Sequence, residues 1–141
     1  MRTMDGTRYR DYGLTILRVG IGIIFFAHGY TKITKMGIDG TAGFMGHLGI
    51  PIPGIIAWYV IIAETVGGIA LILGIFTLPF GIALVIDMAG AIYYAKSSGG
   101  LLGPKGFELE LSLLVASAAI ALAGPGALSL RQLVSRRQSN E

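Results

Sequence analysis

The sequence contains no cysteine, and this absence excludes several classes of protein at once. Disulfide scaffolds, thiol oxidoreductases, iron–sulfur proteins and cysteine-ligated zinc sites all require cysteine side chains. Charged residues are also scarce: they make up 13% of the 141 residues, whereas an ordinary soluble domain carries about 25%. Hydrophobic residues make up 53%, which excludes a disordered chain, because disorder requires low hydrophobicity and high charge. The apolar surface therefore needs a neighbour other than water, and lipid is the obvious candidate.

The apolar residues gather in four stretches, each near the length of about 20 residues that a membrane-spanning helix needs. We expect spans at about residues 12–31, 55–76, 78–95 and 107–123. Four helices that are apolar all round would leave no polar shell to cover them in a soluble protein of this size. The sequence therefore predicts an all-α fold: an integral membrane antiparallel four-helix bundle, with residues 1–141 as a single transmembrane domain. Trp58 and Tyr59 lie near the outer end of the second span, where an aromatic belt anchors helices at the bilayer interface.

Turn residues indicate how these spans are connected. Thr77 and Pro79 predict a tight hairpin between the second and third spans, since proline is tolerated in a first helical turn. The stretch from Lys32 to Gly54 is rich in glycine, which favours a long loop. Its apolar part, Gly43 to Ile50, is expected to lie on the bilayer surface or to dip into it.

Four spans place both termini on one side of the membrane, and the basic residues indicate which side. The flanks on that side hold six arginines, whereas the other side holds four lysines. Because cytoplasmic flanks carry an excess of Lys and Arg, we expect both termini inside a plasma (inner) membrane, with residues 127–141 as a short amphipathic cytoplasmic tail. No basic stripe follows a helix, so this charge fits the anionic lipid of a bilayer and not nucleic acid. The residues counted are Arg2, Arg8, Arg10, Arg131, Arg136 and Arg137 on the terminal side and Lys32, Lys35, Lys96 and Lys105 on the other.

Several ionisable residues fall inside the expected spans, where each costs roughly 2.5–3.5 kcal/mol at a helix centre. They are Arg18, His28, Glu64, Asp87 and Glu110, with Glu108 nearer an end. Counting 1.5 Å per residue from the cytoplasmic end places Arg18 roughly 8 Å deep and Asp87 roughly 14 Å deep, so a long guanidinium could pair with that carboxylate. A second group lies roughly 18–24 Å deep on the same count and could form one polar layer. This group comprises His28, Glu64, Tyr94 and Glu110, with Lys32, Lys96 and Glu108 as its outer rim.

Small residues share the helix faces that carry these charges. Gly22 and Gly29 lie on the face of Arg18, and Gly68 lies on the face of Glu64. Neighbouring helices can therefore approach closely there. Further small-xxx-small pairs permit association either within the bundle or between copies in a homo-oligomer. These pairs are Ala63/Gly67 and Ala70/Gly74.

The expected polar layer suits proton and quinone chemistry. A histidine beside two carboxylates can relay protons, and a tyrosine beside them can hold the oxygen atoms of a quinone. The candidate catalytic residues are His28, Glu64 and Glu110, and the candidate cofactor-binding residues are Arg18, Lys32, Asp87 and Tyr94, with a quinone as the cofactor. No metal is expected, because a carboxylate-bridged metal bundle uses Glu-x-x-His motifs and the sequence has none. The alternative is that these residues form structural ion pairs inside the bundle.

The same residues carry a family resemblance that extends from Leu14 to about Leu133. The ordered set of segments resembles the DoxX-like family of small four-span membrane proteins. The segments are Leu17 to Lys32 (LRVGIGIIFFAHGYTK), His47 to Pro53 (HLGIPIP), Ala63 to Gly74 (AETVGGIALILG), Gly106 to Glu110 (GFELE) and Gly124 to Leu130 (GPGALSL). The positions that match the family pattern are Arg18, His28, Gly29, Lys32, Glu64, Gly68 and the Gly-Pro-Gly stop after the fourth span. Ala127 and Leu128 depart from it, because relatives often carry a bulkier or basic residue before the Ser-Leu pair.

The resemblance implies a link to membrane redox chemistry. Some members of this family resemble the small subunit of a thiosulfate:quinone oxidoreductase, and others are implicated in quinone or thiol-stress responses as accessory partners of oxidoreductases. A first hypothesis is thus an accessory or quinone-interacting subunit of a membrane redox system, whether or not the chain is itself an enzyme. Since the chain has no thiol, a soluble oxidoreductase partner would supply the electrons. A second hypothesis is a non-catalytic membrane scaffold, or a carrier of a small solute or of protons, whose buried charges are structural ion pairs.

Overall fold

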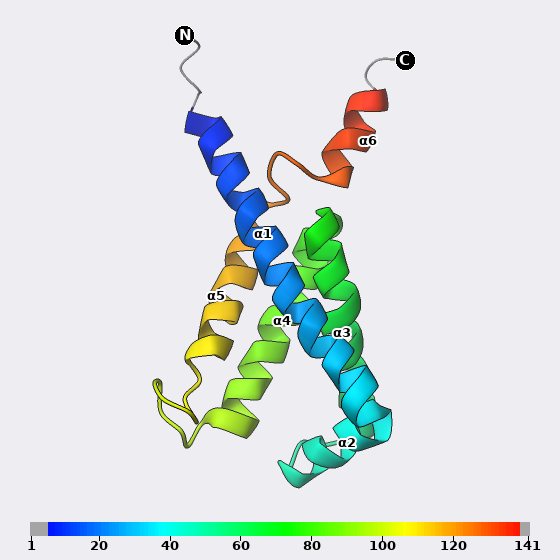
Figure 1. Cartoon of the computed structure of the whole chain (residues 1–141), viewed down its shortest axis with the longest axis vertical. Coiled ribbons are helices and arrows are strands. Elements are labelled where there is room, and N and C mark those ends of the chain that lie inside the picture. The colour runs from blue at the N-terminus through cyan, green and yellow to red at the C-terminus, as the bar shows by residue number, and fades with distance from the viewer. Residues whose placement is uncertain (1–5, 139–141) are drawn as a thin grey trace.

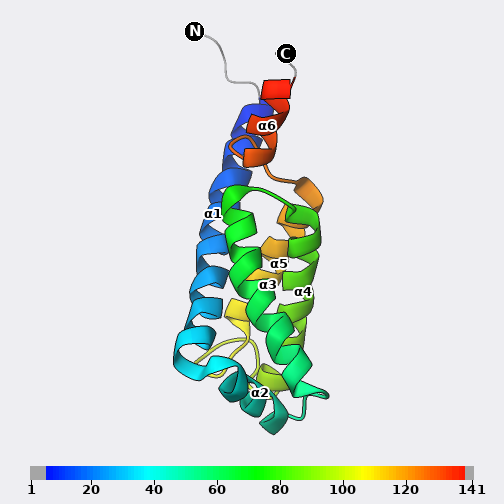
Figure 2. The same cartoon turned by 90° about the vertical axis from the view of Figure 1, so that its right-hand side faces the viewer.

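The computed structural model describes residues 6–138, and every regular element within them is a helix or a helical turn. The elements in chain order are α1 (Gly6–Thr31), the π-helical turn η1 (Lys32–Met36), α2 (Gly37–His47), α3 (Pro53–Leu73), α4 (Thr77–Ala91), the π-helical turn η2 (Ile92–Lys96), α5 (Glu108–Ala123) and α6 (Leu130–Gln138). The helices α1, α3, α4 and α5 run alongside one another (Figure 1, Figure 2). The predicted all-α membrane bundle is confirmed.

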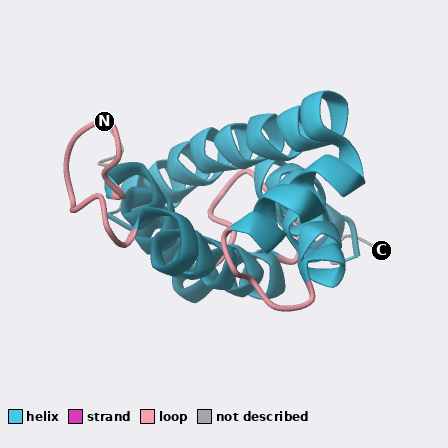
Figure 3. Ribbon diagram, turned by 90° about the horizontal axis from the view of Figure 1, so that it is seen from below, coloured by secondary structure: helices cyan, strands magenta, loops and turns pink. Residues whose placement is uncertain are grey.

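The four long helices pack as two pairs, and the pairs contact each other through one helix of each. α1 packs most extensively against α3, and α4 packs against α5, while contacts between α3 and α4 join the two pairs. The first turns of α1 and the whole of α6 lie at one end of the bundle, and α2 lies at the other end (Figure 1). Figure 3 views the bundle from the end at which α2 lies in Figure 1. At that end α2 packs against α3 and η1.

The outer surface of the bundle is apolar, as a lipid environment requires. Within residues 6–138, three helical stretches are long and apolar enough to cross a membrane: Gly6–His47, Pro53–Leu73 and Thr77–Lys96. Large apolar side chains point outward from three different helices, with Ile16 75% exposed, Ile86 59% and Leu122 88%. α5 has 16 residues, about 24 Å at 1.5 Å per residue, so its crossing of the membrane stays a prediction.

The segment from residue 32 to residue 54, predicted to be a long loop, is largely helical. α1 continues directly into η1, and the chain then turns at Gly37, whose φ of 66° suits glycine. Met45 of α2 is buried against Ala57 and Val60 of α3. This packing outweighs the low helix propensity of the glycines in α2, which the sequence prediction had followed.

Other boundaries lie close to the predicted ones. α1 begins at Gly6, earlier than the expected residue 12. The predicted tight hairpin is confirmed, because only three residues, 74–76, separate α3 from α4. Part of the expected amphipathic tail forms α6, while Arg2 and residues 139–141 lie outside the described residues.

Glycines let α1 and α3 cross at close range, as the sequence predicted. A Cβ atom added to Gly22 would lie 2.7 Å from the carbonyl oxygen of Gly68. One added to Gly68 would lie 2.6 Å from the backbone nitrogen of Phe26, and one added to Gly29 would collide with Oγ1 of Thr65. Two backbones reach this separation only where side chains are missing from both helices.

The small-xxx-small pairs of α3 are used within the single chain. Ala63, Gly67, Ala70 and Gly74 are all buried inside the bundle. A Cβ atom added to Gly67 would lie 3.2 Å from the ring of Phe80 on α4. Association between copies of the chain therefore stays a prediction.

Arg18 is buried near the α6 end of the α1–α3 contact, and the predicted ion pair with Asp87 is wrong. Nη1 of Arg18 donates to the carbonyl oxygens of Leu71 and Ile72, at 2.6 and 2.7 Å, and Nη2 donates to that of Leu128 at 2.5 Å. Arg18 thus binds the last carbonyl groups of α3 and fixes the segment before α6. Asp87 lies ten residues into α4, about 15 Å from the start of that helix, and so at a different depth in the bundle.

We predict that Gly68→Ala lowers the stability of the fold by roughly 1–3 kcal/mol, because the added methyl group overpacks the contact with Phe26. Gly20→Ala is the matched control, since a Cβ atom on Gly20 meets nothing within 4 Å and alanine favours a helix over glycine. Thermal unfolding of the full-length chain in detergent compares the two variants. A Gly68→Ala protein whose Tm equals or exceeds that of the wild type would contradict the close crossing.

Candidate functional site

A cavity of about 420 Å³ lies between α2, α3 and α4, at the end of the bundle away from α6. Most of its lining is apolar, with side chains such as Met45, Val60 and Met88. The structure brings five of the seven candidate site residues to this one cavity. They are Glu64, Glu110, Lys32, Asp87 and Tyr94, and Lys96 lines the cavity with them.

One side of the cavity is formed by an ion pair between α1 and α3. Lys32 is the first residue after α1, and its Nζ lies 2.6 Å from Oε2 of Glu64. The side chain of Glu64 is only 3% exposed and that of Lys32 23% exposed, so little solvent reaches the pair. Lys32, which the sequence placed on the rim of the polar layer, therefore lies inside it.

Asp87 joins this pair from α4. Its side chain lines the same cavity as Lys32 and Glu64, and its Oδ2 is buried without a hydrogen-bond partner. Asp87 itself is 7% exposed. Carboxyl groups that share a buried site repel one another when both are charged, which favours a proton on one of them. The arrangement of Lys32, Glu64 and Asp87 therefore has the composition of a site that can hold and exchange a proton.

A second, looser ion pair lies on the α5 side of the cavity. Nζ of Lys96, at the end of η2, lies 3.8 Å from Oε1 of Glu110 and 3.5 Å from the carbonyl oxygen of Gly106. The other carboxylate oxygen of Glu110, Oε2, is buried and has no hydrogen-bond partner. Tyr94, two residues before Lys96, also lines the cavity.

His28 does not belong to this group, so the predicted layer of His28, Glu64, Tyr94 and Glu110 is wrong in that member. His28 is exposed on the outside of α1, and its Nδ1 lies 2.8 Å from the carbonyl oxygen of Ile24. Gly29, the next residue, lies on the buried face of α1, and one residue corresponds to a rotation of about 100° around a helix. His28 therefore points away from Glu64, although the two residues have similar depths. Arg18 does not line the cavity either, because it binds carbonyl groups elsewhere.

Sequence reasoning missed two contributions to the cavity. Tyr59, expected to anchor the helix at the bilayer interface, lines the cavity and donates a hydrogen bond from its hydroxyl to the carbonyl oxygen of Ala83, at 2.5 Å. Its neighbour Trp58 is 55% exposed and does point outward. The other contribution is one face of α2, which closes the cavity with Thr41, Phe44, Met45 and Leu48. Their spacing of i, i+3, i+4 and i+7 is the helical signal that could have revealed this face.

The arrangement suits a mainly apolar molecule that carries a few polar atoms. Apolar side chains can surround a ring or a chain, while the buried carboxyl and ammonium groups can bind oxygen atoms and exchange protons. Within residues 6–138, no three His, Asp or Glu side chains stand close enough together to hold a metal ion.

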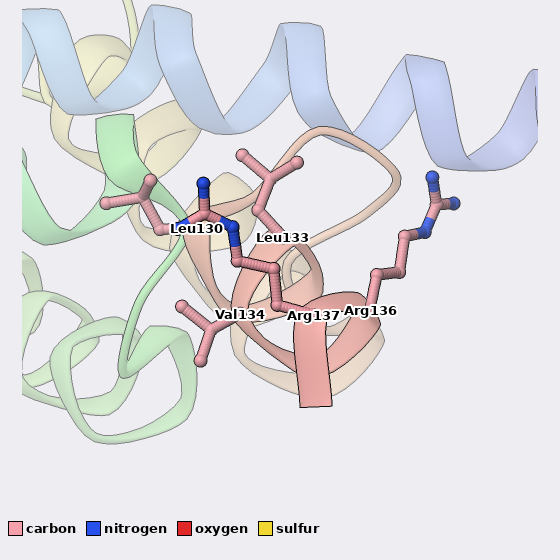
Figure 4. A pocket seen from close by; sticks show the side chains of 5 residues that line it. All are labelled: Leu130, Leu133, Val134, Arg136 and Arg137. Atoms are coloured by element: carbon pink, nitrogen blue, oxygen red, sulfur yellow. The ribbon is translucent and has the colours of Figure 1, made fainter. Parts of the chain in front are cut away.

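A second hollow lies at the opposite end of the molecule, along α6. Figure 4 shows it as an open depression next to α1, with apolar and basic side chains side by side. It is lined by Leu130, Leu133, Val134, Arg136 and Arg137. Among residues 6–138, no carboxylate lines it, so the described part of this hollow lacks the proton-exchanging groups of the cavity.

Comparison with known proteins places the chain in a family. The DoxX family matches residues 13–97. The chain is 32% identical over 139 residues to the inner membrane protein YphA of Escherichia coli (strain K12), an alignment that covers 90% of the chain and 98% of that relative. It is also 32% identical over 130 residues to a protein of Bacillus subtilis (strain 168) named "Putative oxidoreductase CatD", with 92% of both chains covered. No solved structure matches the chain. A family match over more than half of the chain, with relatives that align over nearly their whole length, shows that the chain belongs to the DoxX family of membrane proteins.

Proposed function

We propose that the chain is a membrane subunit of a quinone-linked redox system, and that its cavity binds a quinone and handles the quinone's protons. The observation that carries the proposal is a mainly apolar cavity that contains a buried ion pair, Lys32–Glu64, and a further buried carboxyl group, Asp87. Ionisable groups at such depth in a membrane bundle are expensive, and they mark proton or ligand pathways by default.

The proposal gives each residue of the cavity a role. Glu64 and Glu110 exchange protons with the ligand, while Lys32, Asp87 and Tyr94 bind and orient it. Thr41, Phe44 and Met45 of α2 cover the ligand and keep bulk water from it. His28 and Arg18 have no part in the site, because their side chains lie outside the cavity.

The proposed subunit is an accessory one that works with a partner. The chain has no cysteine to carry thiol chemistry, so a soluble oxidoreductase would deliver or accept the electrons. The name of the Bacillus subtilis relative, a putative oxidoreductase, is consistent with a redox setting. The alternative function is a non-catalytic scaffold or small carrier, and the close Lys32–Glu64 contact also fits the structural ion pair which that alternative requires.

We predict that the purified full-length chain in lipid nanodiscs binds tetramethyl-1,4-benzoquinone or its hydroquinone saturably, and that Glu64→Gln weakens this binding about tenfold. The expected factor follows from the loss of one hydrogen bond or ion pair with a charged group. Equilibrium dialysis measures the binding, with empty nanodiscs subtracted. His28→Ala is the control, since His28 is exposed and, within residues 6–138, the one hydrogen-bond contact of its side chain is with the carbonyl oxygen of Ile24 in its own helix.

Thermal unfolding separates an effect on the fold from an effect on the site. Glu64→Gln keeps a side-chain oxygen for Lys32, so the variant is expected to stay folded. Wild-type protein that is stable but binds neither form would overturn the proposed function and leave the scaffold alternative. Equal binding by the wild type and by Glu64→Gln would overturn the role of Glu64 alone.

We also propose that the α6 end of the bundle faces the cytoplasm and rests on anionic lipid. Arg8, Arg10 and the three arginines of α6 lie at this end of the molecule (Figure 1). In α6 the arginines flank exposed leucine and valine side chains (Figure 4), which is the composition of an interfacial helix. At the other end Lys32 and Lys96 are each paired with a glutamate, which reduces the positive charge there.

Single cysteine substitutions test this orientation without background labelling, because the chain has no cysteine of its own. Ser135 in α6 and Ser98 after η2 are both exposed and lie toward opposite ends of the bundle. In spheroplasts, a membrane-impermeant maleimide is expected to label Ser98→Cys at once and Ser135→Cys only after the membrane is permeabilised. The reverse pattern would place the termini outside.

A further inference from the structure

The two sides of the cavity differ in how well their polar groups are satisfied. On the α1 side, Lys32 and Glu64 bind one another at 2.6 Å, and Asp87 lines the cavity with them. Lys32 and Glu64 therefore have less need of a ligand to complete their hydrogen bonds, although Oδ2 of Asp87 is buried without a hydrogen-bond partner.

On the α5 side the polar groups lack close partners. The contacts of the Lys96 ammonium with Glu110 and Gly106 are 3.8 and 3.5 Å long, beyond the usual length of a hydrogen bond. Oε2 of Glu110 is buried with no hydrogen-bond partner, and within residues 6–138 no side-chain hydrogen bond engages the hydroxyl of Tyr94. Tyr94 is 37% exposed, so the buried atom without a partner is Oε2 of Glu110. Leaving such an atom unpaired is costly, and a ligand atom on this side of the cavity would remove that cost.

The local helix geometry supports a ligand at this position. Tyr94 and Lys96 both belong to η2, a π-helical turn that continues α4. Such turns are rare and frequently occur at functional sites. The same turn presents the phenol and the ammonium to the cavity that Glu110 reaches from α5. The Lys96 ammonium can donate a hydrogen bond, the Glu110 carboxylate can accept one, and the Tyr94 hydroxyl can do either. All three side chains line the same cavity.

We propose that Lys96 and Glu110 bind one oxygen atom of the ligand, and that they select the reduced, hydroxyl-bearing form of a quinone over the oxidised, carbonyl form. A phenolic hydroxyl accepts a hydrogen bond from the Lys96 ammonium and donates its own hydrogen to Oε2 of Glu110. A carbonyl oxygen can only accept, so it would satisfy Lys96 and leave Oε2 of Glu110 buried and unpaired. This inference rests on the proposed function and adds which redox form the site prefers and which residues decide it.

The test compares the affinities of the two redox forms for the same protein. The full-length chain in lipid nanodiscs is dialysed without oxygen against tetramethyl-1,4-hydroquinone or against the corresponding quinone. The wild type is expected to bind the hydroquinone about tenfold more tightly, the effect of one additional hydrogen bond to a charged group. In Glu110→Gln the side-chain amide can donate to a carbonyl, so the preference is expected to fall below about threefold.

Glu108→Gln is the matched control, because Glu108 lies in the same first turn of α5 but does not line the cavity. It is expected to keep the full preference of the wild type. Equal affinity of the wild type for both forms, or an undiminished preference in Glu110→Gln, would overturn the inference while the proposed function stands. Failure of the wild type to bind either form would instead overturn the proposed function, and this inference with it.

Discussion

The site depends on how closely α1 and α3 approach each other. Gly22 and Gly68 remove the side chains that would hold the two backbones apart, and Gly29 does the same beside Thr65. Only three residues after Gly29, Lys32 then reaches Glu64 at 2.6 Å. At the other end of the same contact, Arg18 binds the last carbonyl groups of α3. The residues on one face of α1 thus set how α1 packs on α3, and Lys32 directly after α1 places its ammonium group in the cavity.

The position of the cavity follows from this alignment and from α2. Because α1 runs on through η1, α2 begins close to the ion pair and packs on α3 through Met45. Asp87 on α4 and Glu110 on α5 add to the polar lining, so four helices (α2, α3, α4 and α5) and both π-helical turns contribute to one cavity. Lipid covers the apolar outer faces of the bundle, and the buried charges of Lys32, Glu64 and Asp87 lie together inside it, while Arg18 binds backbone carbonyl groups. The scarcity of charge in the sequence therefore reflects a division between a lipid-facing exterior and one polar interior.

The parts that depend on a repeating pattern could be predicted from the sequence. Span lengths predicted the helical bundle, and small residues predicted the crossing at Gly22 and Gly68. The partners of Arg18 could not be predicted, because they are backbone carbonyl groups, which every residue has, so no residue type in the sequence identifies them. The depth of His28 along α1 predicted that it lies beside Glu64. His28 is instead exposed, because it lies one residue, or about 100° around the helix, from the buried face at Gly29. The glycine content of residues 37–47 led to the prediction of a loop, whereas the structure has helix α2 there. The helical spacing of the apolar residues in this segment would have predicted the helix.

The central claim is that the cavity holds a quinone in the native membrane, and the most direct measurement is the amount of quinone that leaves the membrane with the protein. The full-length chain is extracted with a polymer that retains its surrounding lipid, and the isoprenoid quinone per protein molecule is determined by mass spectrometry. The account predicts a quinone-to-lipid ratio well above that of the bulk membrane, and a ratio close to the bulk value when Asp87→Leu removes a polar group from the cavity. A ratio in the wild type equal to that of the bulk membrane would contradict it.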